Sequence, residues 1–357
     1  MLETKTEKIL LQHYKRYPKM QPADCVKLLY QSEFAGGHLI SDKAKSLERL
    51  NVEYDALCML TAPGQAFEDI GGGILRMNLR ELGSLGITLK TANGFFVGSA
   101  NSAAGTIESF ERKLDVLLQC CRQGKLPFAP RQVERYIKRL KDSGYPPVSH
   151  SEAYRAAYAP AYRVVKSVYC DYTEAFRRID SLLEEKETVS VAIDGNCGAG
   201  KSALASLLFG VYDCNVFRMD DFFLRPEQRT PQRLRQPGEY IDHERFADEV
   251  IAGINSGRQF TYRRYDCSKL SLGGEVIAAP KKLNIIEGSY SMHPKLAGFY
   301  DLKIFMQTGG QEQIKRILTR SGETLLKRFT DEWIPLEEKY FSSFGVKESC
   351  DIIFGAL

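Results

Sequence analysis

The segment that most constrains this chain lies just past its middle, where residues 189–205 read VSVAIDGNCGAGKSALA. The eight residues 195–202 fit the pattern G-x-x-x-x-G-K-[ST], directly after a short apolar run and at the start of a helical pattern. Glycines in such a loop let successive backbone N–H groups turn inward around phosphate oxygens, and the N-terminus of the following helix adds partial positive charge. A glycine-rich turn that binds nothing is the alternative, and the complete match in this context argues against it. We therefore expect a nucleotide phosphate site here.

The residue types of this loop also assign individual tasks. Lys201 would reach the β- and γ-phosphates of ATP, and the Ser202 hydroxyl would ligate Mg²⁺. The residues expected to bind the nucleotide are Gly195, Asn196, Cys197, Gly198, Ala199, Gly200, Lys201, Ser202 and Ala203.

Acidic residues follow two of the predicted strands. Asp220 comes at the end of a strand predicted near 215–219, and Glu287 follows the apolar run 283–286. Ligands of α/β sheets bind at the carboxyl ends of strands, so both carboxylates are expected near the nucleotide. Asp220 could accept the proton of an attacking hydroxyl, and Ser202, Asp220 and Glu287 could hold Mg²⁺. The alternatives are an acidic turn for Asp220 and a solvated strand end for Glu287.

Two arginines near the C-terminus complete the expected catalytic set of Asp220, Lys201, Arg316 and Arg320. Arg316 and Arg320 are spaced by four and therefore share one helix face, which could fold over the phosphates as a lid. A solvated basic face is the competing interpretation.

Composition limits the class of protein and its partners. The chain has 357 residues, enough for two domains, and a formal net charge of +4 without any run of lysines and arginines, so a nucleic-acid partner is not expected. Nine cysteines lack C-x-x-C spacing, which argues against a disulfide framework and a structural zinc site. The charged N-terminus and the lack of a long apolar run indicate a cytoplasmic protein without a membrane partner. The sequence is compatible with a homodimer.

The pattern of the chain changes near residue 187. Residues 1–187 predict a mostly helical, α+β domain that ends in a connecting helix running from about 162 to 187. Two segments of this domain are expected to be extended: 68–79, and 87–97 with a hairpin at Asn93-Gly94. Residues 188–357 alternate strands with helices, which predicts an α/β domain with a doubly wound parallel sheet.

The first domain offers weaker functional signals. His38, Glu68, Asp69 and His150 could form a metal or acid/base site, although local structural roles explain each of them as well. Arg155, Tyr158, Tyr162 and Arg163 would share one face if a helix ran through them, and could contact an anionic substrate.

Seven segments in order resemble the group of uridine kinases, phosphoribulokinases and nicotinamide riboside kinases. They read AIDGNCGAGKSALA, MDDFFLRPEQR, EYIDHERF, YRRYD, IIEGSY, IKRILTR and CDIIF, and span about 170 residues of the C-terminal half only. The resemblance implies a P-loop kinase that uses ATP and Mg²⁺ to phosphorylate a hydroxyl of a small metabolite. It places the catalytic carboxylate on Asp220, with Asp221 beside it. The candidate contacts to the acceptor are Asp221, Tyr240, Arg264 and Tyr265.

The chain departs from uridine kinases in one place. Those enzymes usually carry a histidine shortly after the segment matched here by Tyr265-Asp266, where this chain reads Cys267-Ser268-Lys269-Leu270. The acceptor is therefore expected to be nucleoside-like or sugar-like rather than uridine itself. Arg263 and Arg264 would suit an anionic acceptor, and a solvated strand edge is the alternative.

Three functions remain open from the sequence. The first is a small-molecule kinase, the second is an ATP-gated switch that controls a partner, and the third is a bifunctional enzyme with another active site in the first domain. The acids near the acceptor side favour the kinase, because a switch needs no base for an external hydroxyl. A GTPase is disfavoured because the C-terminal half contains no N-K-x-D segment.

Overall fold

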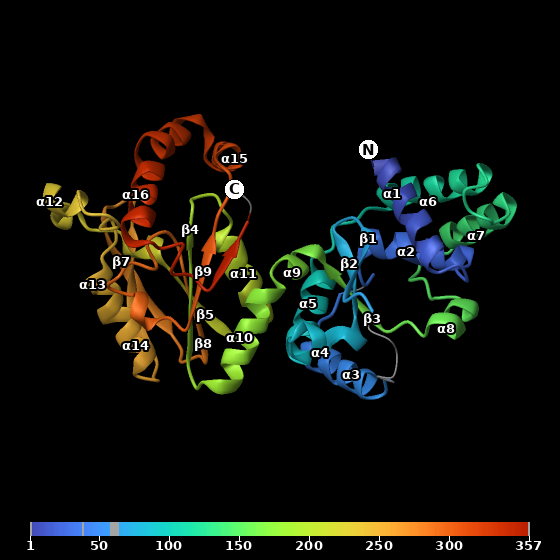
Figure 1. Ribbon diagram of the computed structural model, residues 1–357, viewed down its shortest axis with the longest axis horizontal. Helices are drawn as coiled ribbons and strands as arrows, with labels where there is room; N and C mark the ends of the chain where they lie inside the picture. The colour runs from blue at the N-terminus through green and yellow to red at the C-terminus, as the bar shows by residue number, and fades with distance from the viewer. Residues whose placement is uncertain (1, 38, 58–63, 356–357) are drawn as a thin grey trace. The chain divides into compact units, whose positions relative to one another are not determined.

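The computed structural model describes residues 2–37, 39–57 and 64–355. It divides into two compact units, Met1–Thr173 and Glu174–Leu357 (Figure 1). The helix α10 (Thr173–Glu185), expected from the sequence to end the first domain, lies almost entirely in the second unit. Its contacts explain this placement, since the Tyr212 hydroxyl donates to Asp180 Oδ1 at 2.9 Å and the Lys186 ammonium donates to Asp301 Oδ1 at 2.6 Å.

A five-stranded parallel sheet forms the centre of the second unit. Its order is β10-β9-β4-β8-β5. The strands are β4 (Val189–Gly195), β5 (Cys214–Arg218), β8 (Leu283–Glu287), β9 (Leu302–Met306) and β10 (Ile352–Phe354). Every residue of β4 and β8 is buried, as expected for central strands that are covered on both faces. The predicted α/β fold with a doubly wound parallel sheet is confirmed.

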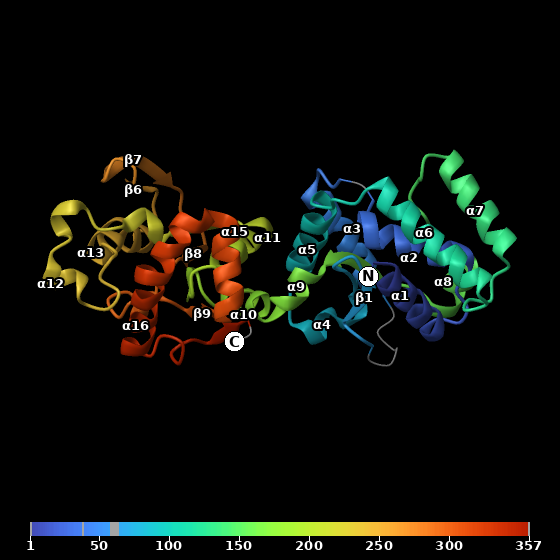
Figure 2. The ribbon, with the colours of Figure 1, turned by 90° about the horizontal axis from the view of Figure 1, so that it is seen from above.

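Helices cover both faces of this sheet. Figure 1 shows α10 and α11 on one face and α13, α14 and α16 on the other. The helices are α11 (Lys201–Val211), α12 (Pro231–Leu234), α13 (His243–Phe246), α14 (Ala252–Asn255), α15 (Gly310–Arg328) and α16 (Ile334–Phe344). Figure 2 shows the hairpin of β6 (Phe260–Asp266) and β7 (Ser271–Ala278) at the edge of this unit.

The first unit is built on a small antiparallel sheet. Its order is β1-β2-β3, with β1 (Phe67–Gly71), β2 (Ile74–Asn78) and β3 (Tyr162–Lys166). Figure 1 shows α1 and α2 on one face and α3 and α5 on the other. The helices are α1 (Leu2–Arg16), α2 (Pro22–Phe34), α3 (Lys43–Asp55), α4 (Leu82–Leu85), α5 (Leu89–Asn101), α6 (Ile107–Arg122), α7 (Pro130–Asp142), α8 (Glu152–Tyr158) and α9 (Ser167–Asp171). The predicted helical α+β character is confirmed.

Two expectations for the first unit are wrong. The segment 87–97 is not a hairpin, because Thr88 caps the helix α5 through Thr91 N and the Asn93 side chain accepts from Ser46 Oγ and donates to Lys43 O. Nor does one helix run from 162 to 187. Ala159 is left-handed at φ 40°, which ends α8, and residues 162–166 pair with β2 as a strand.

The four residues predicted to share a helix face are separated by this break. Arg155 and Tyr158 lie on α8, whereas Tyr162 and Arg163 lie on β3. Successive strand residues point to opposite sides of a sheet, so Tyr162 and Arg163 cannot repeat the spacing of a helix face. Among the described residues, no helix is long and apolar enough to cross a membrane.

Gly72, in the turn between β1 and β2, is predicted to be essential to the packing of the first unit. Its φ is +68° and an added Cβ would lie 2.1 Å from the Ser32 carbonyl oxygen. Gly124 is a matched control, because its φ is also +68° and no described atom lies within 4 Å of an added Cβ. We expect Gly124→Ala to lower the free energy of unfolding by about 1–2 kcal/mol. Gly72→Ala should lower it by a further ~1–3 kcal/mol, measured by urea unfolding. Equal losses in the two variants would show that the close approach to Ser32 is not a constraint.

Candidate active site

The loop between β4 and α11 has the conformation that a phosphate cradle requires. Gly195, Gly198 and Gly200 have φ values of +128°, +75° and +102°, which side chains other than that of glycine rarely allow. At Gly195 an added Cβ would lie 1.9 Å from the Met306 carbonyl oxygen, so no larger residue fits. The Lys201 ammonium donates to the carbonyl oxygens of Gly195 at 2.6 Å and Asn196 at 3.0 Å. The loop thus holds a cation inside a bend of glycines at the start of a helix, which fits an anionic phosphate chain.

Two carboxylates reach this loop from neighbouring strands. Asp220 lies in a 3₁₀ turn, Met219–Phe222, directly after β5, and Glu287 is the last residue of β8. Ser202 Oγ donates to Glu287 Oε2 at 3.2 Å. Burial raises the pKa of Glu287 above its ordinary value, and the negative charge of Asp220 raises it further. A divalent cation between Ser202, Asp220 and Glu287 would relieve this repulsion, so these residues fit Mg²⁺.

A single cavity of about 540 Å³ joins the loop to these carboxylates. This volume is within the range of small-molecule sites. Its walls include residues from the phosphate loop, the strand ends and the helices α15 and α16. The sequence-predicted residues that line it are Cys197, Gly198, Gly200, Lys201, Ser202, Ala203, Asp220, Tyr240, Glu287, Arg316 and Arg320.

The two lid arginines lie on α15 above the loop. Arg316 donates to the Gly198 carbonyl oxygen at 3.3 Å and to Glu312 Oε1 at 2.9 Å. The Arg320 guanidinium lies 5.6 Å from the centre of the Phe329 ring. Because both side chains line the cavity, α15 carries positive charge to the place where phosphates would bind.

Three residues expected to contact the acceptor are absent from the described lining of the cavity. Asp221 Oδ2 lies 3.3 Å from Arg264 Nε in an ion pair. The Tyr265 hydroxyl accepts from Arg229 Nη2 at 3.0 Å, and Tyr265 is buried. Arg263 pairs with Glu249 at 2.7 Å. Arg263, Arg264 and Tyr265 thus lie on β6 and have other partners, and of the predicted acceptor set only Tyr240 lines the cavity as described.

The buried carboxylate of Asp194 contacts the first residue of the loop, and it was not among the residues predicted from the sequence. Asp194 accepts from the backbone N–H of Gly195 at 2.7 Å and of Met292 at 3.0 Å, and from the Tyr340 hydroxyl at 2.9 Å. Complete burial raises its pKa to about 6. An acidic residue inside the apolar run VSVAIDG was the available signal, since buried acids are rare without partners.

Glu337 forms a hydrogen bond with a second part of the loop, at Cys197. No pattern in the sequence predicts this contact. The Glu337 carboxylate accepts from the backbone N–H of Cys197 at 2.9 Å and from the Ser289 hydroxyl. It is buried although it lies 140 residues from Cys197 along the chain. Asp194 and Glu337 together fix the loop before any ligand binds.

The described members of the constellation predicted for the first unit do not come together in one group. His38 lies outside the described residues, and Asp69 Oδ1 accepts from the backbone N–H of Gly71 at 2.8 Å. Glu68 pairs with Arg16 at 3.4 Å and Arg76 at 3.7 Å. His150 instead bonds to Asp24 and Tyr162. Among the described residues, no group with metal-ligand spacing includes any of them.

A group with that spacing does occur in the second unit, formed by the buried Glu239, His243 and His293. The Glu239 carboxylate already accepts from the Lys295 ammonium at 2.6 Å, and Arg233 Nε lies 3.0 Å from it. Two cations therefore neutralise this carboxylate, which is an unfavourable setting for a divalent ion.

The ionised state of Asp194 can be tested with two Tyr→Phe variants. Tyr340 donates to the Asp194 carboxylate, whereas Tyr300 donates to the neutral Ser291 carbonyl oxygen at 2.7 Å. At pH 8, Tyr340→Phe should lower the free energy of unfolding by about 1.5–3 kcal/mol and Tyr300→Phe by about 0.5–1.5 kcal/mol.

The difference between the two variants should depend on pH. Because the folded-state pKa of Asp194 is raised to about 6 from 3.8, its contribution to stability is full below pH 3.8 and is lost as the pH rises through 6. At pH 5 the acid is mostly protonated, so the loss in Tyr340→Phe should approach that of Tyr300→Phe. An equal difference at pH 5 and pH 8, measured by denaturant unfolding, would contradict a titrating Asp194.

No protein-family model matches this sequence. Solved structures match about half of it. A possible uridine kinase from Bacillus stearothermophilus is 18% identical, with 51% of this chain and 99% of that chain covered and a TM-score of 0.38. A candidate fructose transport system kinase from Silicibacter sp. TM1040 is 19% identical, with 47% of this chain and 90% of that chain covered and a TM-score of 0.38. Each of these two structures is thus similar to this chain over about half of this chain's length.

Proposed function

We propose that the second unit transfers the γ-phosphoryl group of ATP to a hydroxyl of a small metabolite. The observation that carries this proposal is the shared cavity, which joins a phosphate loop to Asp220 and Glu287 from two neighbouring strand ends. A site that only binds a nucleotide with Mg²⁺ needs a carboxylate near the metal, which Glu287 can supply, and needs no base. A phosphotransferase needs a further carboxylate as a base, because the attacking hydroxyl must lose its proton.

The phosphate loop has the task of binding and orienting the nucleotide. Its glycines bring the backbone N–H groups close to the phosphate oxygens, and Lys201 offsets their charge. Ser202, Asp220 and Glu287 are the residues that would hold Mg²⁺, which when bound supplies further charge neutralisation on the phosphates. Asp194 and Glu337 keep the loop fixed, so little reorganisation is needed when ATP binds.

Asp220 is the proposed base for the acceptor hydroxyl. Its side chain is exposed within the cavity, so a substrate can reach it. The walls near it include Phe223, Tyr240 and Trp333, whose rings suit the ring of a nucleoside-like or sugar-like acceptor. Arg316 and Arg320 would stabilise the charge on the phosphoryl group during transfer, and α15 would exclude water from it.

The acceptor can be found by following ATP consumption in the presence of Mg²⁺. The purified chain would be tested against a panel of nucleosides, sugars, polyols and their phosphorylated or carboxylated relatives. We expect one class of acceptor to stimulate ADP formation, and Lys201→Ala to abolish that stimulation because the phosphates lose their cation. Tight ATP binding without stimulation by any acceptor would favour the ATP-gated switch instead.

The role of Asp220 is tested by Asp220→Asn. This change keeps the shape of the side chain but removes the base and weakens one of the three proposed Mg²⁺ ligands. Turnover at saturating Mg²⁺ and ATP should therefore fall about 10²–10⁴-fold, and the affinity for ATP measured without Mg²⁺ should change little. Asp213→Asn is a matched control, since Asp213 is exposed in the same unit and pairs with Lys281 at 2.6 Å. Unchanged turnover in Asp220→Asn, measured with the identified acceptor, would exclude Asp220 as the base.

A further inference from the structure

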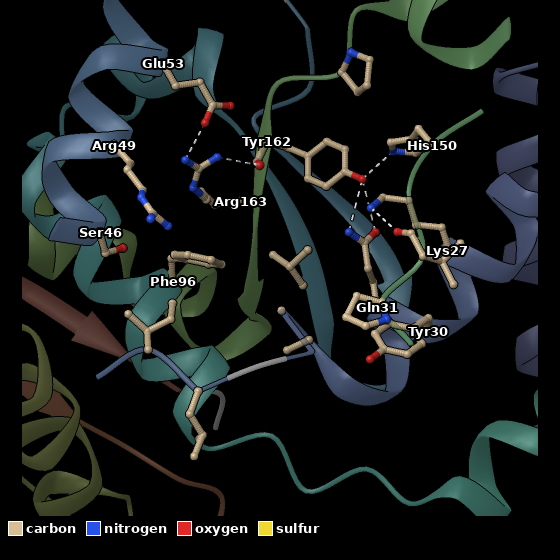
Figure 3. A pocket seen from close by; sticks show the side chains of 18 of the residues that line it. Lys27, Tyr30, Gln31, Ser46, Arg49, Glu53, Phe96, His150, Tyr162 and Arg163 are labelled. Atoms are coloured by element: carbon tan, nitrogen blue, oxygen red, sulfur yellow. Dashed lines mark hydrogen bonds and ion pairs between the residues drawn. The ribbon is translucent and has the colours of Figure 1, made fainter. Parts of the chain in front are cut away.

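The first unit contains a cavity of its own, of about 580 Å³, which the proposed phosphoryl transfer does not use. It lies between α2, α3, α5, β3 and the segment 147–150. Figure 3 shows its two sides. Arg49, Glu53, Arg163 and Phe96 lie on one side, and Lys27, Gln31, His150 and Tyr162 lie on the other.

The charged residues of this cavity are mostly basic. Lys27, Lys45, Arg49 and Arg163 line it, against only two acidic residues, Asp42 and Glu53. Both acids are already engaged. The Asp42 carboxylate accepts from the backbone N–H of Lys45 at 2.9 Å and so caps α3, and Glu53 accepts from Arg163 at 2.6 Å.

Lys45 and Arg49 are the available cations. They lie one turn apart on α3, so their side chains share one face of the helix. Both are exposed, and within residues 2–37, 39–57 and 64–355 neither side chain has a hydrogen-bond or ion-pair partner. An exposed basic helix face is common by itself. Here that face forms one side of a cavity, and hydrogen-bonded polar side chains form the opposite side.

The opposite side of the cavity is held by a chain of buried hydrogen bonds. His150 Nδ1 lies 2.8 Å from Asp24 Oδ1, and His150 Nε2 lies 2.6 Å from the Tyr162 hydroxyl. The carboxylate can only accept, so Nδ1 carries the proton and Nε2 accepts from Tyr162. Burial lowers the pKa of His150, which keeps the ring neutral. The hydroxyl of Tyr162 is thus fixed where it can accept from a ligand.

Two further groups complete this polar side. Gln31 Oε1 accepts from Arg76 at 2.9 Å, which orients the amide so that Gln31 Nε2 donates to the Tyr162 hydroxyl at 3.3 Å. The Lys27 ammonium donates to the Val148 carbonyl oxygen at 2.8 Å, and burial lowers its pKa to about 8. Lys27 still has two N–H groups for a ligand.

We infer that this cavity is a second small-molecule site, which binds a phosphorylated metabolite. Its phosphate would lie against Lys45, Arg49 and Arg163, and its hydroxyl groups would face Tyr162, Gln31 and Lys27. The volume is within the range of small-ligand sites, and two cations without partners match the double charge of a phosphate monoester. This inference goes beyond the proposed kinase activity, because every residue of the site belongs to the first unit.

The test uses the full chain saturated with Mg²⁺ and a non-hydrolysable ATP analogue, so that the phosphate loop cannot bind the probe. Ribose 5-phosphate is the probe in isothermal titration calorimetry, inorganic phosphate is the minimal probe, and ribose is the neutral match. We expect both phosphates to bind and ribose not to bind at the same concentrations. The affinity of the phosphates should fall as salt is added.

Variants place the binding in this cavity. Arg49→Ala and Lys45→Ala should each weaken the binding of ribose 5-phosphate about tenfold or more, since each removes a charge-assisted hydrogen bond. Both residues are exposed, so the fold should survive, and the affinity for the ATP analogue should not change. Arg112→Ala is the matched control, because Arg112 is an exposed arginine on α6 that does not line the cavity.

Two results would overturn the inference. One is that neither phosphate binds the analogue-saturated chain at millimolar concentration. The other is that ribose 5-phosphate binds with an affinity that Arg49→Ala and Lys45→Ala leave unchanged, which would place it at another site.

Discussion

The pairing of β4 with strands on both of its sides determines where each proposed catalytic group lies. β4 pairs in parallel with β8 and β9, and β8 pairs in turn with β5. Parallel strands end at the same edge of a sheet, so the phosphate loop, Glu287 and Asp220 come together. They do so although about 90 residues of sequence separate the loop from Glu287. Asp194 then secures the end of β4, since its buried carboxylate accepts from the loop and from Tyr340. Without this register the carboxylates would not share a cavity with the loop.

The sequence predicted those parts of the site that follow directly from strand order. The loop and Glu287 each stand immediately after an apolar run, and Asp220 follows a predicted strand, so the three positions follow from the sheet alone. The contact between Asp194 and Tyr340, which supports the loop, depends instead on tertiary packing, because the two residues lie 146 positions apart in the sequence. The same reason explains the error at 87–97, where Asn93-Gly94 resembles a turn but Thr88 caps a helix. Local preference was overridden there by packing against α3.

The two units differ in how their cavities are built. In the second unit a short motif supplies most of the groups proposed to bind phosphate, so the proposed site could be predicted from the sequence. In the first unit the lining residues come from positions between 27 and 53, from 96, and from 147–150 and 160–164, and no single spacing in the sequence relates them. The sequence relates Arg163 only to Arg155, Tyr158 and Tyr162, through a predicted helix at a place where the structure has the strand β3. The three-dimensional arrangement alone shows that Arg49, Arg163 and His150 line one cavity.

The most direct test of the proposed kinase activity follows the phosphoryl group itself. ATP labelled at the γ-phosphate would be incubated with the full chain, Mg²⁺ and a mixture of small hydroxyl-bearing metabolites, and the products would be separated by chromatography. Transfer to a hydroxyl held near Asp220 predicts the label in an organic phosphate, formed in equal amount with ADP. Label found only in inorganic phosphate, or left in ATP, would contradict the account.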